Sequence, residues 1–177
     1  AGAAVVALML SLAVRPALGV RWRQRVQRSW AGLRLETFLD LPYLWRAGFS
    51  ASGQNAAVLE ADLAATAQDW IIAYWHHPPY SFGSHNSDTE LQMVEMRENL
   101  VPILEDYGVD LVLTGHSHAY ERSYLLDGHY GDSTTFGPQY ILDGGDGSET
   151  GDGVYLKPDT GMTPHQGAVY AVSGNAG

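Results

Sequence analysis

Cysteine is absent from the 177 residues of this chain. The absence excludes disulfide bonds and thiolate metal sites, so any bound metal must use imidazole, carboxylate, amide or backbone ligands. Basic residues are also scarce: ten Lys and Arg stand against 20 Asp and Glu, which gives a net charge of −10. A surface of this sign repels the phosphates of duplex nucleic acid, so we expect no such partner.

Long hydrophobic runs are lacking as well. The apolar stretch at residues 1–14 is too short to cross a bilayer as a helix, and we expect no stable membrane span. Hydrophobic residues nevertheless make up 45% of the chain and aromatic residues 11%, which is typical of a globular protein. The length suits one domain with a real core.

Charge is divided unevenly along the chain. The first 46 residues hold seven of the ten basic residues but only two of the 20 acidic ones. We therefore treat residues 1–50 as an unassigned basic and apolar segment. Three hypotheses account for it: a secretory signal whose charged start is missing, GC-rich coding DNA read in the wrong frame, or a basic helix on a membrane surface or partner. The uninterrupted coding sequence upstream of Ala51 would distinguish them.

A strand, helix, strand order is predicted between residues 70 and 114. The string WIIAYW at residues 70–75 is short and rich in aromatic and β-branched residues, which indicates a buried strand. A helix capped by Asp88 or Thr89 follows and runs to about Tyr107, and the apolar run at residues 111–113 predicts a second strand. Such a βαβ unit implies parallel strands and a right-handed crossover.

Further elements flank this unit. An amphipathic helix is predicted over residues 55–69, capped by Asn55. Residues 123–126 and 129–130 flank Asp127-Gly128, which predicts a hairpin, and residues 139–142 and 168–172 are strand candidates. The Gly- and Asp-rich stretch 143–155 has four acids for calcium, but their spacing fits no EF-hand and favours an acidic surface loop.

Imidazoles follow both predicted strands of the βαβ unit. His76 and His77 come directly after the first strand, and His116 and His118 follow the second, one residue beyond a glycine. The carboxyl ends of parallel strands lie at one edge of a sheet, where ligands bind in open α/β folds. We therefore expect these imidazoles to converge, with His85 on the intervening loop. Neutral imidazole is a common ligand of zinc, iron and copper, so the convergence predicts a metal site rather than isolated loop histidines.

Two strings in this region resemble a known family. HHPPYSFGSH and LVPILEDYGVDLVLTGHSHAYERS are similar to the C-terminal half of calcineurin-like metallophosphoesterases, in the purple-acid-phosphatase-like branch. The resemblance covers about residues 55–177, and its GH-x-HAYER string is highly specific. It implies an α/β fold, the C-terminal half of an αββα sandwich in which a βαβ unit precedes short antiparallel strands. We accordingly assign residues 51–177 to the C-terminal half of such a domain.

The resemblance also implies roles for single residues. His76 and His116 would bind one metal ion and His118 the other, although the residues alone leave open whether His76 or His77 is the ligand. His85 would contact the phosphoryl group and help the leaving oxygen depart, as both a substrate-binding and a catalytic residue. The residues that would hold the ligands in place are His77, Tyr80, Tyr120, Glu121 and Arg122.

The implied activity is the hydrolysis of small-molecule phosphate esters by a dinuclear centre of Fe, Zn or Mn ions. Resemblance to secreted relatives further implies export to the periplasm or the exterior. The family's Asp-x-His, Gly-Asp-x-x-Tyr and Gly-Asn-His motifs are absent from residues 1–50, and with them roughly half of the ligands of a two-metal site. We therefore expect the chain itself to be an incomplete, weakly active piece with a partial site. The alternative is a non-catalytic metal-binding or surface-interaction module. The oligomeric state is not predicted.

Overall fold

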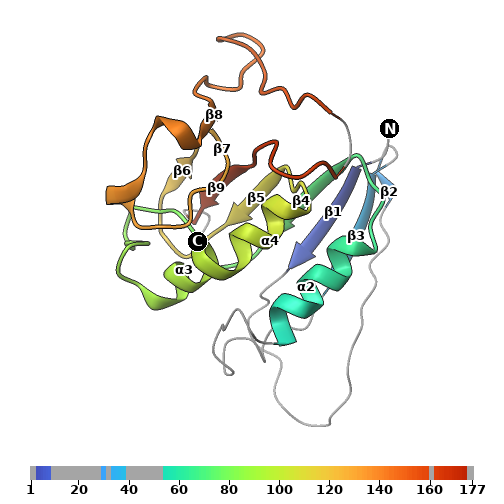
Figure 1. Cartoon of the computed structure of the whole chain (residues 1–177), viewed down its shortest axis with the longest axis horizontal. Coiled ribbons are helices and arrows are strands. Elements are labelled where there is room, and N and C mark those ends of the chain that lie inside the picture. The colour runs from blue at the N-terminus through green and yellow to red at the C-terminus, as the bar shows by residue number, and fades with distance from the viewer. Residues whose placement is uncertain (1–2, 9–28, 31–32, 39–53, 160–161, 175–177) are drawn as a thin grey trace.

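A mixed β-sheet forms the centre of the molecule (Figure 1). The computed structural model describes residues 3–8, 29–30, 33–38, 54–159 and 162–174. Within these ranges seven strands share one sheet in the order β2-β3-β1-β4-β5-β9-β6, and β7 pairs with β8 beside it. The strands are β1 Ala3–Leu8, β2 Ser29–Trp30, β3 Leu33–Phe38, β4 Trp70–Tyr74, β5 Leu111–Thr114, β6 Tyr120–Arg122, β7 Leu125–Leu126, β8 Ile141–Asp143 and β9 Val169–Ser173.

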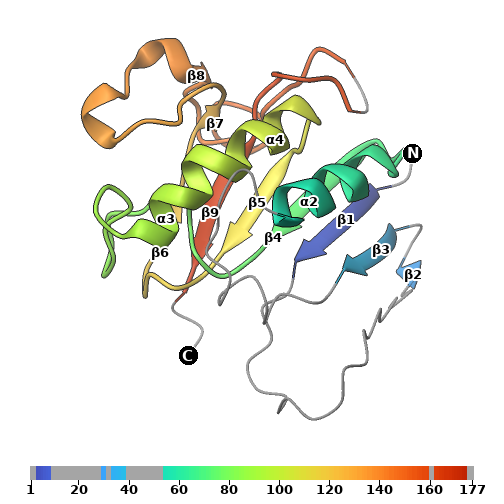
Figure 2. The same ribbon diagram turned by 60° about the horizontal axis from the view of Figure 1, so that its bottom comes forward.

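Helices cover one face of this sheet, as Figures 1 and 2 both show. They are α2 Gln54–Ala64, α3 Leu91–Glu95, the π-helical turn η1 Met96–Leu100 and α4 Val101–Asp106, the last three running end to end. Two short 3₁₀ turns follow, η2 Ser133–Thr135 and η3 Pro138–Tyr140. Leu63 of α2 and Leu104 of α4 are fully buried in the same cluster as Ile71 and Val112 of the sheet. The core therefore lies between the helices and this face.

Both predicted helices differ from the structure at their ends. The helix expected from Asp88 or Thr89 begins at Leu91, with Glu90 as its N-cap residue. The carboxylate of Asp88 instead accepts hydrogen bonds from the backbone N–H and the hydroxyl of Ser133, so it is not used as a cap. Pro102 has no N–H to donate, and the helix widens into a π turn just before it. The earlier helix, expected over residues 55–69, is α2 and ends at Ala64.

The predicted βαβ unit is confirmed and sets the position of the site. β4 and β5 are parallel, with Ile72 opposite Leu111 and the two strands ending together. The pairing continues beyond the strands, because Trp75 N–H donates to the carbonyl of Leu113 (3.1 Å) and Gly115 N–H donates to the carbonyl of His76 (3.0 Å). The segments that follow the two strands consequently run side by side.

The turn after β7 differs from the predicted hairpin. β7 pairs with β8 and not with residues 129–130, so this prediction was wrong. Gly128 does adopt the positive φ of such a turn (+78°). However, the carbonyl of His129 accepts a hydrogen bond from the Tyr80 hydroxyl, and that of Tyr130 accepts one from Arg97 Nε. Side chains from earlier in the chain therefore take backbone acceptors that a second hairpin strand would use.

The acidic stretch at residues 143–155 is organised by its own carboxylates. Asp146 accepts a hydrogen bond from Ser148 N–H, and Asp152 accepts one from Asp146 N–H. These are the local bonds by which Asp side chains form turns, as expected of a surface loop.

The amino-terminal strand β1 lies between β3 and β4 in the same sheet, although the sequence predicts no element within residues 1–50. Much of that segment, together with residues 51–53, lies outside the described ranges. The domain boundary after residue 50 and the three hypotheses for the segment stay predictions. In the part of the chain that the structure describes, no helix is both long and apolar enough to cross a membrane.

Candidate metal centre

Histidines meet at the edge of the sheet where β4 and β5 end. His76 follows β4, and the hydrogen bond from Gly115 N–H to its carbonyl places it next to His116. The backbone turns sharply there, because Ser117 N–H donates to the carbonyl of Gly115 at 2.7 Å. His116 has a φ of +60°, a conformation that is costly for a residue other than glycine and that clusters at functional sites.

Three imidazoles lie within the reach of one metal ion. His76 Nε2 and His116 Nδ1 are 3.1 Å apart. One ligand nitrogen from each of His76, His77 and His116 lies within 4.8 Å of the others. Two nitrogens that bind a common ion at about 2.1 Å are themselves roughly 3.0–3.4 Å apart. The spacing of His76 and His116 therefore fits a metal ion. His77, which the resemblance places as a supporting residue and the residues alone leave open as a ligand, offers a third nitrogen close to this pair.

Desolvation favours the neutral form of two of these imidazoles, His76 and His77. It lowers the pKa of His76, with a further contribution from the neighbouring His116 and His85. Burial and then repulsion by His116 lower the pKa of His77 to about 4, and this side chain is only 3% exposed. Because metals bind the neutral ring, both residues are in the ligating form at neutral pH without having to lose a proton.

A carboxylate joins His116 to the loop histidine. Glu90 Oε1 lies 2.8 Å from His85 Nδ1, and Glu90 Oε2 lies 3.2 Å from His116 Nε2. The rings of His85 and His116 have centroids 3.9 Å apart. Desolvation acts to raise the pKa of Glu90, but hydrogen bonds from His116, His85 and the Asn86 N–H outweigh it, so the pKa lies below its usual value. His85, Glu90 and His116 form a second group of close donor atoms.

The other predicted site residues lie farther out. His118 is exposed and donates its backbone N–H to Ser84 Oγ, and in the described part of the chain no group of three close donor side chains includes it. Glu121 accepts hydrogen bonds from Ser81 Oγ and Phe82 N–H, which fixes the start of the His85 loop.

Three predicted supporting residues make their contacts elsewhere. The Tyr80 hydroxyl donates to the carbonyl of His129, and Tyr120 is 68% exposed. Arg122 donates to the carbonyl of Asp146 and lies over the ring of Tyr155. The structure therefore brings His76, His77, His85 and His116 together and leaves these three side chains outside the cluster.

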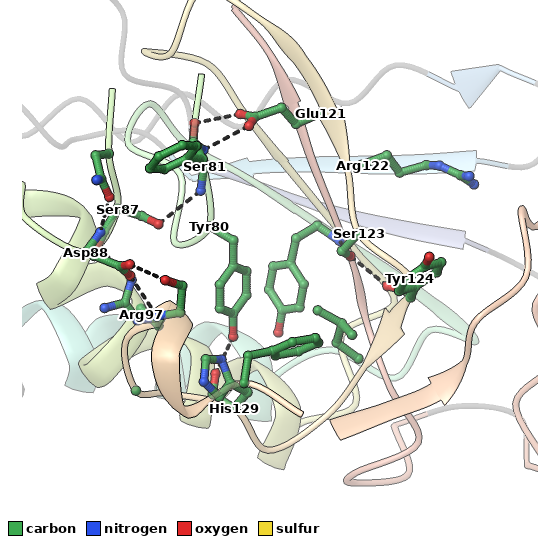
Figure 3. A pocket seen from close by; sticks show the side chains of 17 residues that line it. Tyr80, Ser81, Ser87, Asp88, Arg97, Glu121, Arg122, Ser123, Tyr124 and His129 are labelled. Atoms are coloured by element: carbon green, nitrogen blue, oxygen red, sulfur yellow. Dashed lines mark hydrogen bonds and ion pairs between the residues drawn. The ribbon is translucent and has the colours of Figure 1, made fainter. Parts of the chain in front are cut away.

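A cavity of about 630 Å³ is lined in part by Ser81, Ser87 and Asp88 of the segment that also carries His85 (Figure 3). None of the four clustered histidines lines it. Its lining is rich in aromatic rings, with charged groups at its edges, and includes Tyr80, Tyr124, Phe136, Asp88, Glu121 and Arg122. The size is that of a small-molecule site, but the chemistry of the histidines is centred next to the cavity rather than in it.

Sequence reasoning missed Glu90. Its position was read only as part of the start of a helix, where an acid is ordinary. The available signal is its placement five residues after His85, at the point where the loop turns into the helix. That signal does not reveal that the carboxylate turns back toward the histidines, since this depends on the loop closing through the bonds between Asn86 and Glu90.

Comparison with known proteins gives a consistent result. The family model for calcineurin-like phosphoesterases matches residues 27–120, just over half of the chain. Purple acid phosphatase 15 of Arabidopsis thaliana is 32% identical over 120 residues, which cover 66% of this chain and 21% of the relative. Purple acid phosphatase 18 of the same plant is 37% identical over 97 residues, covering 52% and 21%. Acid phosphatase A of Cryphonectria parasitica is 32% identical over 111 residues, covering 58% and 21%.

The fold has a counterpart among solved structures. Purple acid phosphatase PPD1 from yellow lupin (Lupinus luteus) seeds superposes with a TM-score of 0.51 at 18% identity, covering 73% of this chain and 20% of that one. This likeness confirms the predicted α/β fold class. The chain spans about a fifth of the length of these relatives. With its matched family model and these relatives, the chain belongs to the calcineurin-like phosphoesterase family.

Proposed function

We propose that this chain carries part of a dinuclear metal centre that hydrolyses phosphate esters, as in a purple acid phosphatase. The contact between His76 Nε2 and His116 Nδ1 at 3.1 Å is the observation that carries the proposal. It joins the ends of two parallel strands through atoms whose lone pairs suit a metal, in a chain that belongs to a family of phosphoesterases. Fe, Zn and Mn are the proposed metals, and small-molecule phosphate esters are the proposed substrates.

The histidines have different proposed roles in metal binding. His76, His77 and His116 would hold one ion, and His118 is assigned to the other. When bound, such a pair of ions supplies a nucleophile from water at neutral pH and positive charge for the phosphoryl oxygens. The two groups of close donor atoms that the described residues offer at this edge share His116, so we expect the chain alone to bind about one ion and to turn over slowly.

His85 is proposed as the proton donor. Its Nδ1–H faces Glu90, which leaves Nε2 to carry the proton that the leaving oxygen of the ester takes. The ring lies against His116, so the donor stays beside the metal ligands throughout. As the phosphorus–oxygen bond breaks, the leaving oxygen takes this proton and departs as a neutral alcohol.

The test combines metal binding with turnover. We expect calorimetric titration with Zn²⁺ or Mn²⁺ to show about one tightly bound ion per chain, and p-nitrophenyl phosphate to be hydrolysed slowly and only with added metal. His116→Ala should abolish both. Glu98→Gln, which changes an exposed carboxylate that belongs to none of the groups of close donor side chains in the described residues, should abolish neither.

Two outcomes would speak against the proposal. Turnover that persists without metal or in His116→Ala would exclude a histidine-bound metal centre. Tight binding without turnover by any of the three metals would favour the alternative, a non-catalytic metal-binding module. Export of the protein stays a prediction from the family resemblance.

A further inference from the structure

One carboxylate contacts both functional parts of the histidine cluster. The two oxygens of Glu90 are divided between two rings, Oε1 facing His85 Nδ1 at 2.8 Å and Oε2 facing His116 Nε2 at 3.2 Å. A single side chain therefore connects the proposed metal ligand with the proposed proton donor.

The two nitrogens of His116 face different partners. Nδ1 faces His76 Nε2, and Nε2 faces Glu90. A neutral imidazole has one lone pair and one N–H. If Nδ1 supplies the lone pair to a metal, Nε2 must carry the proton, and an anionic oxygen is its natural acceptor. A carboxylate in this place fixes the tautomer and the orientation of the ring and makes it a stronger ligand.

The same argument excludes Glu90, His85 and His116 as a second full metal site. Although the three offer donor atoms within 4.8 Å of one another, His116 would have to bind through Nε2 as well as Nδ1. A neutral ring cannot do so, because one of its nitrogens is protonated. Glu90 is thus better placed to accept protons than to bind an ion.

The backbone holds the carboxylate in position. Asn86 N–H donates to Glu90 Oε1 at 3.2 Å, and Glu90 N–H donates to the carbonyl of Asn86 at 3.1 Å. Glu90 itself has an extended backbone (φ −84°, ψ 115°) immediately before the helix. These bonds close the loop that carries His85 onto the residue that binds His85, so the side chain has little freedom to leave either ring.

We propose that Glu90 is a positioning residue that sets the tautomers of His116 and His85 together, so that metal affinity and the orientation of the proton donor depend on one carboxylate. Its part in turnover rests on the proposed phosphatase function. Its effect on the two rings and on metal affinity does not.

The test uses Glu90→Gln, which keeps the shape of the side chain. Its amide has only one accepting oxygen, so it cannot accept hydrogen bonds from the His85 and His116 rings through two oxygens as the carboxylate does. Zn²⁺ alone is the probe in calorimetry, and ¹⁵N NMR of histidine-labelled protein reports the tautomers. We expect Zn²⁺ affinity to fall about 10- to 100-fold with unchanged stoichiometry. The defined Nδ1–H form of His85 and Nε2–H form of His116 should become mixtures. Glu98→Gln, an exposed carboxylate three residues beyond Glu95 on the same helix, is the matched control and should change nothing.

Glu90→Asp provides a second reading if the amide variant folds poorly. It keeps the charge but is one carbon shorter, so its carboxylate should reach only one of the two rings. The tautomer of that ring should be preserved, and the other ring should become a mixture of tautomers. A drop in the number of ions bound would show that Glu90 is a ligand, and unchanged affinity and tautomers would show a surface carboxylate; either result overturns the proposal. If the Glu90 variants change the tautomers but the unsubstituted chain hydrolyses no ester, the positioning role of Glu90 is supported and the proposed phosphatase function is excluded.

Discussion

His116 combines two constraints, one on its side chain and one on its backbone. Both of its ring nitrogens face partners, and its backbone has a φ of +60°, which costs on the order of 1–3 kcal/mol for such a residue. The surrounding chain must therefore hold this turn in place. Part of that support comes from the end of β9, where Gly174 N–H donates to the carbonyl of Ala119 at 3.1 Å.

Gly174→Ala tests this support. A Cβ on Gly174 would overlap with the backbone carbonyl of Ser117, in the middle of the histidine turn. Because backbone cannot move aside as a flexible side chain can, we expect a loss of about 1–3 kcal/mol in the free energy of unfolding and weaker Zn²⁺ binding. Urea unfolding and calorimetry measure the two effects.

Gly144→Ala is the control for this substitution. An added Cβ there meets only Ile141 Cγ2 at 3.6 Å, an ordinary contact. We expect it to leave both quantities unchanged. Zn²⁺ affinity that is equal in the two variants would show that the end of β9 does not determine the turn.

At the scale of elements, the helix of α3, η1 and α4 is joined to the loops around the site by one buried cation. Arg97 is 2% exposed. Its Nη1 donates to the carbonyls of Ser87 (2.7 Å) and Pro79 (3.2 Å), and its Nε donates to that of Tyr130 (3.2 Å). Asp88 lies 3.9 Å away and balances the charge. The helix, the loop after β4 and the loop after β7 are thus held by a single side chain.

Arg97→Met should therefore be strongly destabilising. The substitution keeps an apolar stem but leaves three carbonyls without their donor and Asp88 without its cation. Removing one partner of a buried charged group costs about 3–5 kcal/mol, and we expect a loss in this range in urea unfolding. Arg122→Met, at an exposed guanidinium, should cost less than about 1 kcal/mol. Similar losses in both variants would contradict this account.

At the scale of the whole molecule, His165 forms ion pairs that link the segment before β9 to the end of α4 and to the turn after β7. One ring nitrogen lies 3.0 Å from Asp106 at the end of α4, and the other lies 3.1 Å from Asp127 after β7. Its backbone N–H donates to the carbonyl of Glu105, whose carboxylate lies close by. Burial acts to lower the pKa of His165, but hydrogen bonds and the charges of Asp127 and Asp106 outweigh it, so the pKa lies above its usual value.

This shift predicts how stability changes with pH. A raised pKa in the folded state means that the stabilisation by His165 is fully present below the unfolded value of 6.5 and is lost as pH rises through the folded value. His165→Asn removes the ion pairs, and Asn tolerates the positive φ of +57° at this position. The variant should be less stable by up to about 1 kcal/mol near pH 6, because the pairs are half-exposed, and by less near pH 9. Equal differences at the two pH values in urea unfolding would exclude a charged His165.

The sequence was sufficient for the strands that carry the site. Short apolar runs ending at Trp75 and Leu113 predicted parallel strands, and the shared edge of such strands predicted that His76 and His116 would meet, as they do. This part succeeds because alternating burial and the geometry of parallel sheets are local rules. The same reasoning could not choose between His76 and His77, because they are adjacent in the chain, and the structure places a nitrogen of each close to His116.

The remainder depends on contacts between residues far apart in the chain. The pairing of β7 with β8 follows from Tyr80 and Arg97 binding the carbonyls of residues 129–130, and no local pattern contains that information. The part played by Glu90 likewise depends on which way its loop closes. The strand β1 has parallel partners, β3 and β4, that both lie more than 20 residues away in sequence, so no local turn indicates its pairing.

The clustered donors from His76 to His116 all lie within one unit, made of the crossover between β4 and β5, β5 itself and the turn that follows it. Closing one connection of moderate length is therefore enough to assemble them, and the entropic penalty of that closure grows only slowly with its length. The segment from the end of β4 to the turn at His116 can therefore be transferred to another protein as one piece. Grafted into another parallel sheet with the same strand spacing, it should carry its clustered imidazoles with it.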